Sequence, residues 1–354
     1  MAIENLQSVN IGLIGFGKSA SMFHAPIIRS LPSYKIAAVV SSDSNKVHKN
    51  LPDVKVYNSV DELVGNSDVD LVVVTSPNRL HYEHAKKALL SNKHVIVEKP
   101  FVTEVSQGEE LIEIADDLGL KLSVYHNRRW DNCFLTAKQL ISDNQIGEIY
   151  TYECCFDRFR INVDHNKWKE QDQDGSGILY DLGSHLIDQA LHLFGKPKSI
   201  FADIAVQRKN GTANDYFHLL MKYLDKRVIL RSCSVVLKPT HHIAIHGSMG
   251  SYIKVGLDPQ EDSLKNGLSP NDPSWGLEHN SDNIVIFTQM VNGVPQLKNV
   301  ELLKGSYEEY YIQMLNALRN NSRVPILASD ALEVIKIIKL AEKSNGEKRE
   351  IEMS

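Results

Sequence analysis

The sequence predicts an α/β fold in two domains: a doubly wound parallel sheet, followed by a domain built on a large, mixed or mostly antiparallel sheet. Three observations predict it. Short runs of β-branched residues alternate with stretches of helical periodicity in the first ~125 residues. A glycine-rich turn follows the first of these runs. Beyond that region, runs typical of strands follow one another with few helices between them.

The composition is that of an ordinary globular protein. The chain has 354 residues, enough for two domains, of which 42% are hydrophobic and 23% charged. A net charge of -5 and a pI of about 6.3 lack the basic surplus that nucleic acid or an anionic membrane requires of a partner. No apolar run reaches the ~18 residues of a membrane span. We therefore expect neither partner.

The N-terminus and the cysteines bear on the compartment. Met1–Ser8 has no basic region followed by an apolar core, so no secretory signal is predicted. The four cysteines have neither zinc-finger spacing nor the density of a disulfide scaffold. We expect a reduced, cytoplasmic protein.

The first predicted strand, Val9–Ile14, leads into a G-x-G-x-x-A pattern, the fingerprint of a dinucleotide-binding turn. Gly15 permits the tight turn, Gly17 lets the backbone approach a pyrophosphate, and Ala20 lets a helix reaching Ser30 pack closely on the strand. The start of that helix offers free N–H groups and a positive dipole end to phosphates. The residues expected to contact the dinucleotide here are Gly15, Phe16, Gly17, Lys18 and Ser19.

The end of the second predicted strand, Lys35–Val40, bears on which dinucleotide is bound. A fold specific for NAD usually places Asp or Glu about 20 residues past the glycines, where it binds the ribose diol. This chain has Ser41 and Ser42 there, whose hydroxyls do not repel a 2′-phosphate, and Lys46 nearby can attract one. We therefore expect NADP, with NAD as the alternative, because Asp43 can reach back to a diol.

A third strand, Asp70–Thr75, ends in a loop that should pass close to the cofactor, because it lies at the same edge of the sheet as Gly15. His81 and His84 are three residues apart, but no third ligand is in sight, and we expect no metal there. The cofactor contacts expected from this loop are Thr75, Ser76, Pro77, Asn78 and His81.

Val95–Val97 is a run of three β-branched residues and predicts a strand buried on both faces. It ends in Glu98, Lys99 and Pro100, and the strand stops there because proline cannot donate to a ladder. In open α/β sheets, ligands sit outside the carboxyl ends of the strands. We therefore expect the Lys99 amine at the ligand edge rather than on a plain surface.

The boundary between the domains is expected after residue 126, which gives a dinucleotide-binding domain over 1–126 and a second domain over 127–354. A strand, Leu122–Tyr125, is followed by polar and aromatic residues in which Asn127 and the arginines either line a cleft between the domains or form a solvated linker. The second domain is expected to open on a helix, Phe134–Ser142. Its predicted strands are Ile149–Phe156, Ser199–Val206, Phe217–Tyr223, Val228–Val236, Ile243–His246 and Gly250–Lys254.

A helix predicted from Ile178 onward carries the second chemical pattern. Asp181 and His185 are four residues apart and share a face, with Asp188 further along the same stripe. A carboxylate beside an imidazole raises the imidazole pKa and fixes its orientation, which suits a general base. The alternative is a buried histidine hydrogen-bonded inside a packed helix. No matching pair occurs elsewhere, so a metal site is not expected.

Towards the C-terminus, Pro259–Trp275 is rich in Pro, Asn, Asp and Gly and predicts a long loop. It is either a lid over the active site or a contact with a neighbouring subunit. Two further helices are predicted by periodicity, Tyr307–Arg319 and Asp330–Ser344.

These motifs together resemble the glucose–fructose oxidoreductase/inositol dehydrogenase (Gfo/Idh/MocA) family over nearly the whole chain. The matching pieces are Gly15-Phe16-Gly17, Thr75-Ser76-Pro77-Asn78 with His81, Glu98-Lys99-Pro100, and Asp181-Leu182-Gly183-Ser184-His185. Within that family the chain is most similar to the NADP-dependent scyllo-inositol dehydrogenases, through Ser123–Asn132, Tyr180–Leu193 and Asp272–Gly276. The NADP-using relatives tend to carry Ser-Arg where this chain has Ser42-Asp43, so NAD stays open.

The resemblance implies an N-terminal Rossmann domain and a C-terminal α/β domain whose large open sheet supports the active site and subunit contacts, in a homodimer or homotetramer. The implied reaction moves a hydride between NAD(P) and a secondary alcohol of a cyclitol or sugar. His185 would take the hydroxyl proton, Asp181 would orient His185, and Lys99 would hydrogen-bond the reacting oxygen.

The resemblance also implies that Glu98 and Lys99 lie beside the cofactor, and that Asn127 and Asp157 bind substrate hydroxyls together with Asp181 and His185. For Asp157, a surface position on a strand is an equal alternative. Two other functions stay open: a dehydrogenase of another sugar or polyol, and a non-catalytic regulatory protein that senses NAD(P).

Overall fold

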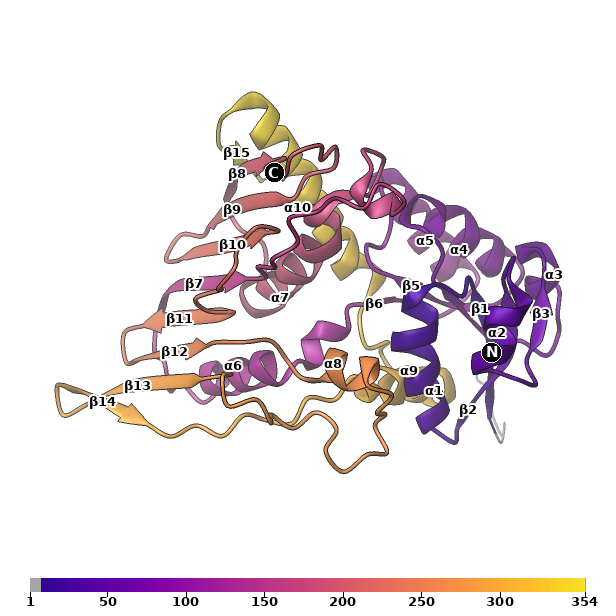
Figure 1. The fold of residues 1–354 in the computed structure, drawn as a ribbon, viewed down its shortest axis with the longest axis horizontal. Coiled ribbons are helices and arrows are strands. Elements are labelled where there is room, and N and C mark those ends of the chain that lie inside the picture. Colours follow the sequence, from indigo (N-terminus) through magenta and orange to yellow (C-terminus); the bar gives the residue numbers. More distant parts are fainter. Residues whose placement is uncertain (1–7, 354) are drawn as a thin grey trace. The chain divides into compact units, whose positions relative to one another are not determined.

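The computed structural model describes residues 8–353 and divides them into two compact units (Figure 1). Unit 1 holds the described residues up to Asn127, together with Gln260–Trp275 and Ser306–Glu333. Unit 2 holds Arg128–Pro259, Gly276–Gly305 and the residues from Val334 onward. The prediction that Met1–Ser8 carries no secretory signal concerns residues of which all but Ser8 lie outside the described range. No helix within residues 8–353 has the length and apolarity to cross a membrane.

The sheet of unit 1 confirms the predicted doubly wound parallel fold. Its six strands run in the order β3-β2-β1-β4-β5-β6, and all neighbours are parallel. The strand order reverses between β1 and β4, which is the point where open α/β sheets bind ligands. The strands are β1 Val9–Ile14, β2 Tyr34–Val40, β3 Lys55–Tyr57, β4 Leu71–Val74, β5 His94–Glu98 and β6 Leu122–Tyr125.

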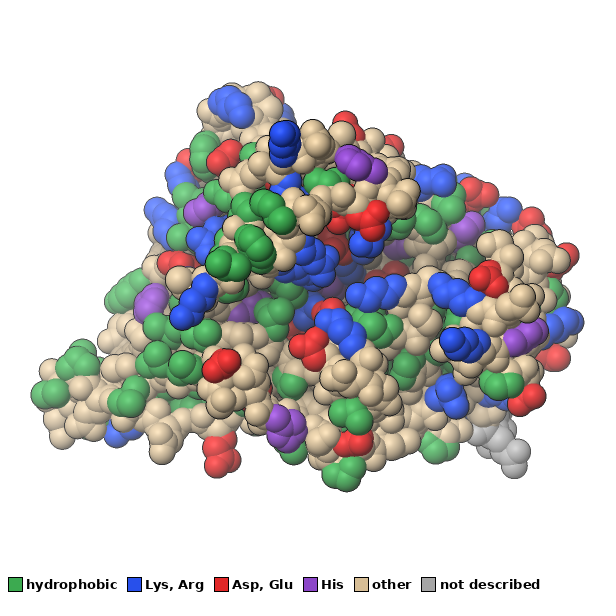
Figure 2. Space-filling model, in the orientation of Figure 1, with side chains coloured by type: hydrophobic (Ala, Val, Ile, Leu, Met, Phe, Trp, Pro, Cys, Tyr) green, Lys and Arg blue, Asp and Glu red, His purple; other side chains and the backbone are tan. Residues whose placement is uncertain are grey.

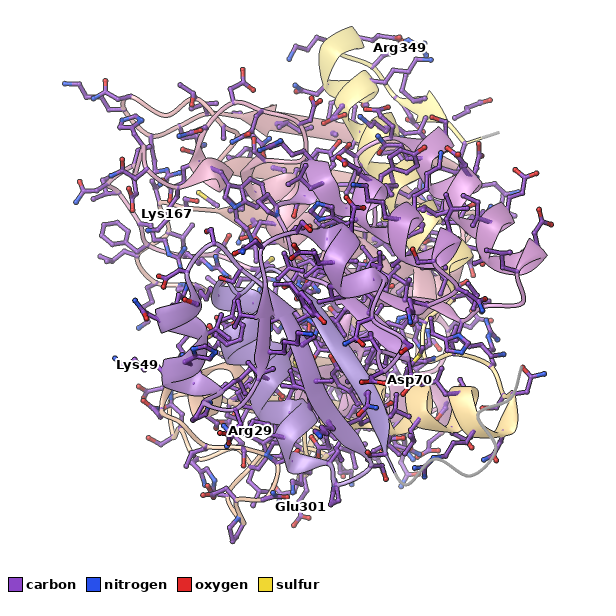
Figure 3. The ribbon with its side chains drawn as sticks, turned by 90° about the vertical axis from the view of Figure 1, so that its right-hand side faces the viewer. Arg29, Lys49, Asp70, Lys167, Glu301 and Arg349 are labelled. Atoms are coloured by element: carbon purple, nitrogen blue, oxygen red, sulfur yellow. The ribbon has the colours of Figure 1, made fainter. Side chains whose placement is uncertain are left out.

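The central strands of this sheet are buried on both faces because helices cover it on both sides. Every residue of β4 is fully buried, which explains its uninterrupted apolar sequence. Asp70, labelled in Figure 3, lies just before β4. Its carboxylate accepts a hydrogen bond from the Asn10 amide at 2.9 Å. The helices of unit 1 are α1 Ala25–Ser30, α2 Ser44–Asn50, α3 Val60–Val64, α4 His81–Leu90, α5 Val105–Asp117, α8 Gln260–Lys265 and α9 Glu308–Asn320, with a π-helical turn at Ser19–His24.

The segment predicted as a long loop, Pro259–Trp275, contains helix α8 and is anchored inside unit 1. The buried side chain of Gln260 accepts a hydrogen bond from the Tyr307 amide at 2.7 Å. Trp275 is fully buried, and its indole N–H donates to Glu308 at 2.8 Å. The loop prediction was wrong for the α8 residues because the turn-rich composition hid these two anchors.

The sheet of unit 2 is mostly antiparallel, as predicted. Its nine strands run in the order β14-β13-β12-β11-β7-β10-β9-β8-β15, with one parallel pair, β10 and β7. Burial alternates along β9, Tyr216–Lys222, as expected of a sheet with one face on a core. The other strands are β7 Ile149–Cys155, β8 Ser199–Ala205, β10 Arg227–Cys233, β11 Ile243–Gly247, β12 Gly250–Lys254, β13 Val285–Val291, β14 Val294–Lys298 and β15 Ile351–Glu352.

Three helices contribute to unit 2: α6 Asn132–Ser142, α7 Ser184–Phe194 and the later part of α10 Ala328–Glu347. The helix predicted from Ile178 begins as a π-helical turn, Leu179–Gly183, which packs on β9 and β10 and continues into α7. A Cβ at Gly183 would lie 3.3 Å from the ring of Phe217, so the absence of a side chain permits this close packing. α10 lies along β8, because the Ser344 hydroxyl accepts from the Ala202 amide at 3.0 Å.

The surface carries mixed charge. On the face in Figure 2, basic and acidic side chains are interspersed rather than gathered by sign. Apolar side chains are exposed on the hairpin of β13 and β14, where Leu297 is 73% and Val294 57% accessible. Such an exposed apolar patch is typical of an interaction surface.

Candidate active site

The glycine turn after β1 has the geometry of a dinucleotide-binding turn. Gly15 adopts φ +93°, and a Cβ there would lie 3.2 Å from the carbonyl oxygen of Thr75, so only glycine fits without strain. At Gly17, no described atom beyond its own residue and its chain neighbours lies within 4 Å of where a Cβ would be. The backbone at Gly17 is therefore open to a close approach from outside, as a bound pyrophosphate requires. The neighbouring Phe16 is buried and Lys18 is exposed.

The end of β4 is locked to this turn. The hydroxyl of Thr75 donates to the carbonyl oxygens of Ile14 and Gly15, both at 3.0 Å. Thr75 was expected to contact the cofactor, but its hydroxyl hydrogen-bonds the backbone of the glycine turn. These two bonds fix the end of β4 relative to the end of β1.

The loop after β4 is in turn tied to the end of β5 by His81, which is 1% exposed. Nδ1 of His81 lies 2.8 Å from the carbonyl oxygen of Pro100, and Nε2 lies 2.9 Å from that of Ser76. A carbonyl oxygen only accepts, so both bonds form together only when both ring nitrogens carry a proton. Pro77 and the buried Asn78 complete this loop and begin a short 3-10 helix.

The side chain of Glu98, at the end of β5, is the centre of a buried network. Its Oε1 accepts from His24 Nε2 at 3.0 Å and from the Ser19 hydroxyl, and its Oε2 accepts from the Lys99 amide at 2.9 Å. Burial by itself would raise the pKa of Glu98, but the hydrogen bond and charge of His24, the charge of Lys99 and the Ser19 bond together lower it to about 2. Glu98 is therefore held as a carboxylate.

Aromatic rings enclose this network. His24 Nδ1 lies 2.6 Å from the hydroxyl of Tyr311 on α9, and the His24 ring lies 4.2 Å from that of Tyr125. Tyr310 meets Tyr125 edge to face at 4.8 Å. Sequence reasoning missed His24 and these tyrosines, because they are far apart in the chain and form no short-spaced motif.

Lys99 follows β5 directly, is half-buried, and joins Pro100 through a cis peptide bond. It stands at the same edge of the sheet as the glycine turn and the loop after β4. Asn127 follows β6 at the start of a short 3-10 helix and is buried. The carboxyl edge of unit 1 thus brings together the predicted groups Gly15–Ser19, Thr75–His81 and Glu98–Lys99.

After β2, Asp43 makes hydrogen bonds to residues close to it in the sequence. Its carboxylate accepts from the Lys46 amide at 2.9 Å and caps the N-terminus of α2. Its own amide donates to the hydroxyl of Ser41 at 3.1 Å. Ser42 and Lys46 are exposed.

The remaining predicted residues lie in unit 2. Asp181 sits in the π-helical turn, where its Oδ1 accepts from Lys169 at 2.7 Å and its Oδ2 lies 3.8 Å from Arg158. His185 follows in the first turn of α7 and is 5% exposed.

The other two carboxylates of this region face arginines. Asp188, on α7, receives two hydrogen bonds from the Arg129 guanidinium, at 2.8 and 2.7 Å. Asp157 follows β7, is 8% exposed and accepts from Arg231 at 2.8 Å. The alternative that Asp157 is a surface residue of a strand is therefore wrong, because it lies beyond the strand end and is buried. Asp188 has the contacts of a structural ion pair.

Two family descriptions match the chain. Residues 9–126 match the Gfo/Idh/MocA description "Oxidoreductase family, NAD-binding Rossmann fold". Residues 138–353 match "Oxidoreductase family, C-terminal alpha/beta domain". Together they span both sheets described above.

Relatives and solved structures agree with this. The chain is 39% identical to scyllo-inositol 2-dehydrogenase (NADP(+)) IolW of Bacillus subtilis over 98% of this chain and 97% of that protein. It is 41% identical to the uncharacterized oxidoreductase YdgJ of Escherichia coli over 94% and 95% of the two chains. The structure of a putative oxidoreductase, yvaA from Bacillus subtilis, superimposes with a TM-score of 0.96 at 38% identity, covering 99% of this chain and 100% of that one.

Proposed function

The chain belongs to the Gfo/Idh/MocA family of NAD(P)-dependent oxidoreductases, and we propose that it interconverts a secondary alcohol of a cyclitol, scyllo-inositol, and the corresponding ketone with NADP. The choice of scyllo-inositol as substrate rests on the 39% identity, over nearly the full length of both chains, to a relative named for that reaction. The glycine turn and the open backbone at Gly17 support the binding of a dinucleotide.

In the proposed reaction, His185 accepts the hydroxyl proton of the substrate as the carbon–hydrogen bond breaks. Bound NADP supplies the hydride acceptor. Lys99 donates a hydrogen bond to the reacting oxygen and stabilises the negative charge that develops on it. Asp181 keeps the imidazole of His185 oriented and stabilises its protonated form.

The other predicted site residues have supporting roles in this proposal. Asn127 and Asp157 bind further hydroxyls of the substrate, with Asp157 held in place by Arg231. In this proposal, residues 1–126 form the domain that binds the dinucleotide. Residues 127–354 form the domain that binds substrate and makes the subunit contacts.

The preference for NADP rests on the turn after β2. Because the Asp43 carboxylate caps α2, it is occupied with the Lys46 amide instead of reaching for a ribose diol. Ser41, Ser42 and Lys46 then surround the position of a 2′-phosphate with hydroxyls and a positive charge. The relative named for NADP(+) supports the same choice.

The test begins with fluorescence titration of NADPH and NADH, followed by absorbance assays on inositol isomers and common sugars. We expect tighter NADPH binding and turnover of scyllo-inositol. Lys99→Ala and His185→Ala should each lower kcat by ~10²–10⁴-fold. His192→Ala, an exposed position on the same helix as His185, is the matched control and should keep full activity. Unchanged turnover in both site variants would contradict the assignment.

The same panel separates the alternatives. Turnover of another polyol or sugar, with the same loss in the Lys99 and His185 variants, would keep the chemistry and change the substrate. Cofactor binding without turnover of any compound would favour a non-catalytic sensor of NAD(P).

We also propose a homodimer or homotetramer in the reducing cytoplasm. The exposed apolar side chains of the β13–β14 hairpin, Leu297 and Val294 among them, support self-association. All four cysteines are free and buried, which fits a compartment that keeps thiols reduced. Light scattering would give the mass directly, and a monomer would contradict the proposal.

A further inference from the structure

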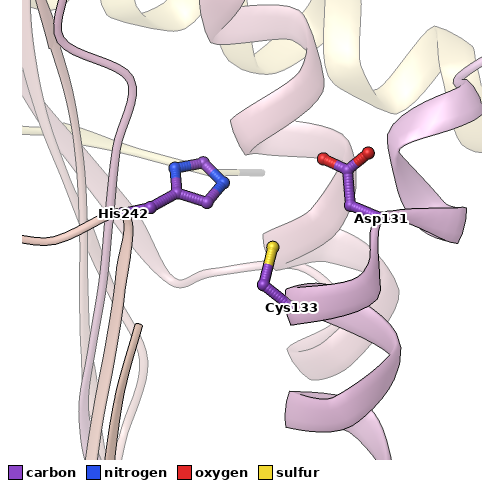
Figure 4. Close-up of side chains that lie close together, drawn as sticks. All are labelled: Asp131, Cys133 and His242. Atoms are coloured by element: carbon purple, nitrogen blue, oxygen red, sulfur yellow. The ribbon is translucent and has the colours of Figure 1, made fainter. Parts of the chain in front are cut away.

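A second cluster of chemically active side chains lies inside unit 2 and shares no residue with the proposed substrate site. The ligand atoms of Asp131, Cys133 and His242 all lie within 4.8 Å of one another (Figure 4). The three side chains are 0%, 0% and 3% exposed. Asp131 immediately precedes α6, Cys133 is in its first turn, and His242 immediately precedes β11.

His242 is arranged as histidine ligands of metals are. Its Nδ1 lies 2.7 Å from the carbonyl oxygen of Cys155, and because a carbonyl only accepts, Nδ1 carries the proton. Nε2 then presents a lone pair, is buried, and has no hydrogen-bond partner among residues 8–353. Figure 4 shows the ring extending toward Asp131 and Cys133. A backbone carbonyl that fixes the tautomer in this way is the usual outer contact of a metal-bound histidine.

We propose that Asp131, Cys133 and His242 form a buried site for Zn²⁺ or a chemically similar divalent transition metal. A nitrogen, a sulfur and a carboxylate oxygen are the donor types that Zn²⁺ takes, whereas Mg²⁺ and Ca²⁺ take oxygen alone. Binding exchanges the Cys133 proton for the cation: the S–H bond breaks, the S–metal bond forms, and one proton leaves to solvent. Water fills the fourth position.

Geometry and charge both bear on this assignment. Zinc bonds of ~2.0–2.3 Å place tetrahedral ligand atoms about 3.5 Å apart, so the side chains close in by about 1 Å through small rotations. Arg128 lies 3.4 Å from the Asp131 carboxylate, and Lys254 also acts on the cluster with positive charge. Loss of the thiol proton offsets part of the added charge, and Arg128 continues to neutralise Asp131.

A metal at this site would tie the start of α6 to the start of β11 and would act on the stability of unit 2. The sequence offered no signal for it, because Cys133 and His242 are more than a hundred residues apart and neither lies in a short-spaced ligand motif.

The experiment uses the full chain, stripped with a chelator and titrated with Zn²⁺ and Co²⁺. We expect about one ion per chain, a thiolate-to-cobalt charge-transfer band with tetrahedral visible bands, and a Tm that rises by a few degrees with Zn²⁺. Cys133→Ser should remove the charge-transfer band, and His242→Gln should weaken Co²⁺ binding at least tenfold. Cys233→Ser, a buried cysteine outside the cluster, should change neither.

Absence of a thiolate–cobalt band in the unaltered protein would overturn the proposal, and this result needs no variant to fold. A band that persists in Cys133→Ser would place the metal on another cysteine and would overturn it as well. None of these readouts depends on oxidoreductase activity, so the outcome is independent of the proposed reaction.

Discussion

The carboxylate of Glu98 and the imidazole of His24 meet inside unit 1, with 3.0 Å between Oε1 and Nε2. The same carboxylate holds the Ser19 hydroxyl and the backbone amide of Lys99. One side chain therefore joins the helix that follows the glycine turn to the strand end that presents Lys99. In the proposed reaction, this rigid support would hold the Lys99 amine against the reacting oxygen.

Replacing Glu98 with Gln is expected to lower stability by roughly 3 kcal/mol at pH 7, because the buried pair with His24 loses its charge. The folded-state pKa of Glu98, about 2, lies below its ordinary value of 4.5. The ionised carboxylate therefore contributes its stability above pH ~4.5 and loses it as the pH falls towards ~2. Urea unfolding across this range should show the two proteins converging in acid. Glu113→Gln, on the exposed face of α5, is the control, and equal stability at pH 7 would contradict the assigned role.

Replacing the two glycines of the turn after β1 should have different effects, one on stability and the other on cofactor affinity. Gly15→Ala forces a side chain into φ +93° against the Thr75 carbonyl and should destabilise the protein by about 1–3 kcal/mol. Gly17→Ala meets no described atom within 4 Å, so its Tm should stay near that of the parent. Its NADPH affinity should fall at least tenfold, because the added methyl group stands where the pyrophosphate approaches. Thermal unfolding and fluorescence titration of both variants separate the two effects, and a Gly17→Ala protein with full affinity would argue against the site.

Asp43→Ala tests the cofactor preference. Loss of the α2 cap should cost about 1 kcal/mol of stability. The ratio of NADPH to NADH affinity should change less than threefold, because the carboxylate is engaged by the Lys46 amide. Asp43→Asn, which preserves a capping side chain, is the matched comparison. A large gain of NADPH preference in both variants would instead mean that Asp43 reaches the ribose.

Asp188 and Asp181 lie seven residues apart along the same helical stretch but should behave differently. Asp188→Asn leaves the largely buried Arg129 guanidinium without its carboxylate and should cost about 3–5 kcal/mol. Asp181 is partly accessible and faces Lys169, so Asp181→Asn should change stability little while lowering kcat. Denaturant unfolding and steady-state kinetics on both variants test this contrast. A large fall of kcat in a still-folded Asp188→Asn protein would give Asp188 a part in the chemistry.

The sequence predicted strands β1, β2, β4, β5 and β6 of unit 1 and the glycine turn after β1, because these signals are local. Gly15 indicates a turn with a positive φ, and Lys99 directly follows a strand whose burial is indicated by the β-branched run Val95–Val97. The network around Glu98 was not predictable in the same way. His24 and Tyr311 reach it from elements almost three hundred residues apart, and only the packing of α9 on α1 makes them neighbours.

Unit 2 shows the same limit. The π-helical turn before α7 was predicted as ordinary helix, because residue spacing does not reveal how closely Gly183 must approach Phe217. The hairpin of β13 and β14 was missed, because its solvent-facing residues break the alternation that marks a half-buried strand. The positions in β14 are mostly exposed, so their sequence lacks the alternation of apolar and polar residues that predicts a strand.

The two outer edges of the nine-stranded sheet have a consequence for aggregation. β15 pairs with β8 at Ser199 and Ile200, and the Met353 amide donates to the Lys198 carbonyl at 2.8 Å, so the start of the β8 edge is already paired. At the opposite edge, β14 carries Pro295, which has no N–H to offer an incoming strand. Both edges thus resist the strand addition that starts amyloid-like growth. Deleting residues 349–353 would uncover the β8 edge and should favour precipitation of an otherwise folded chain.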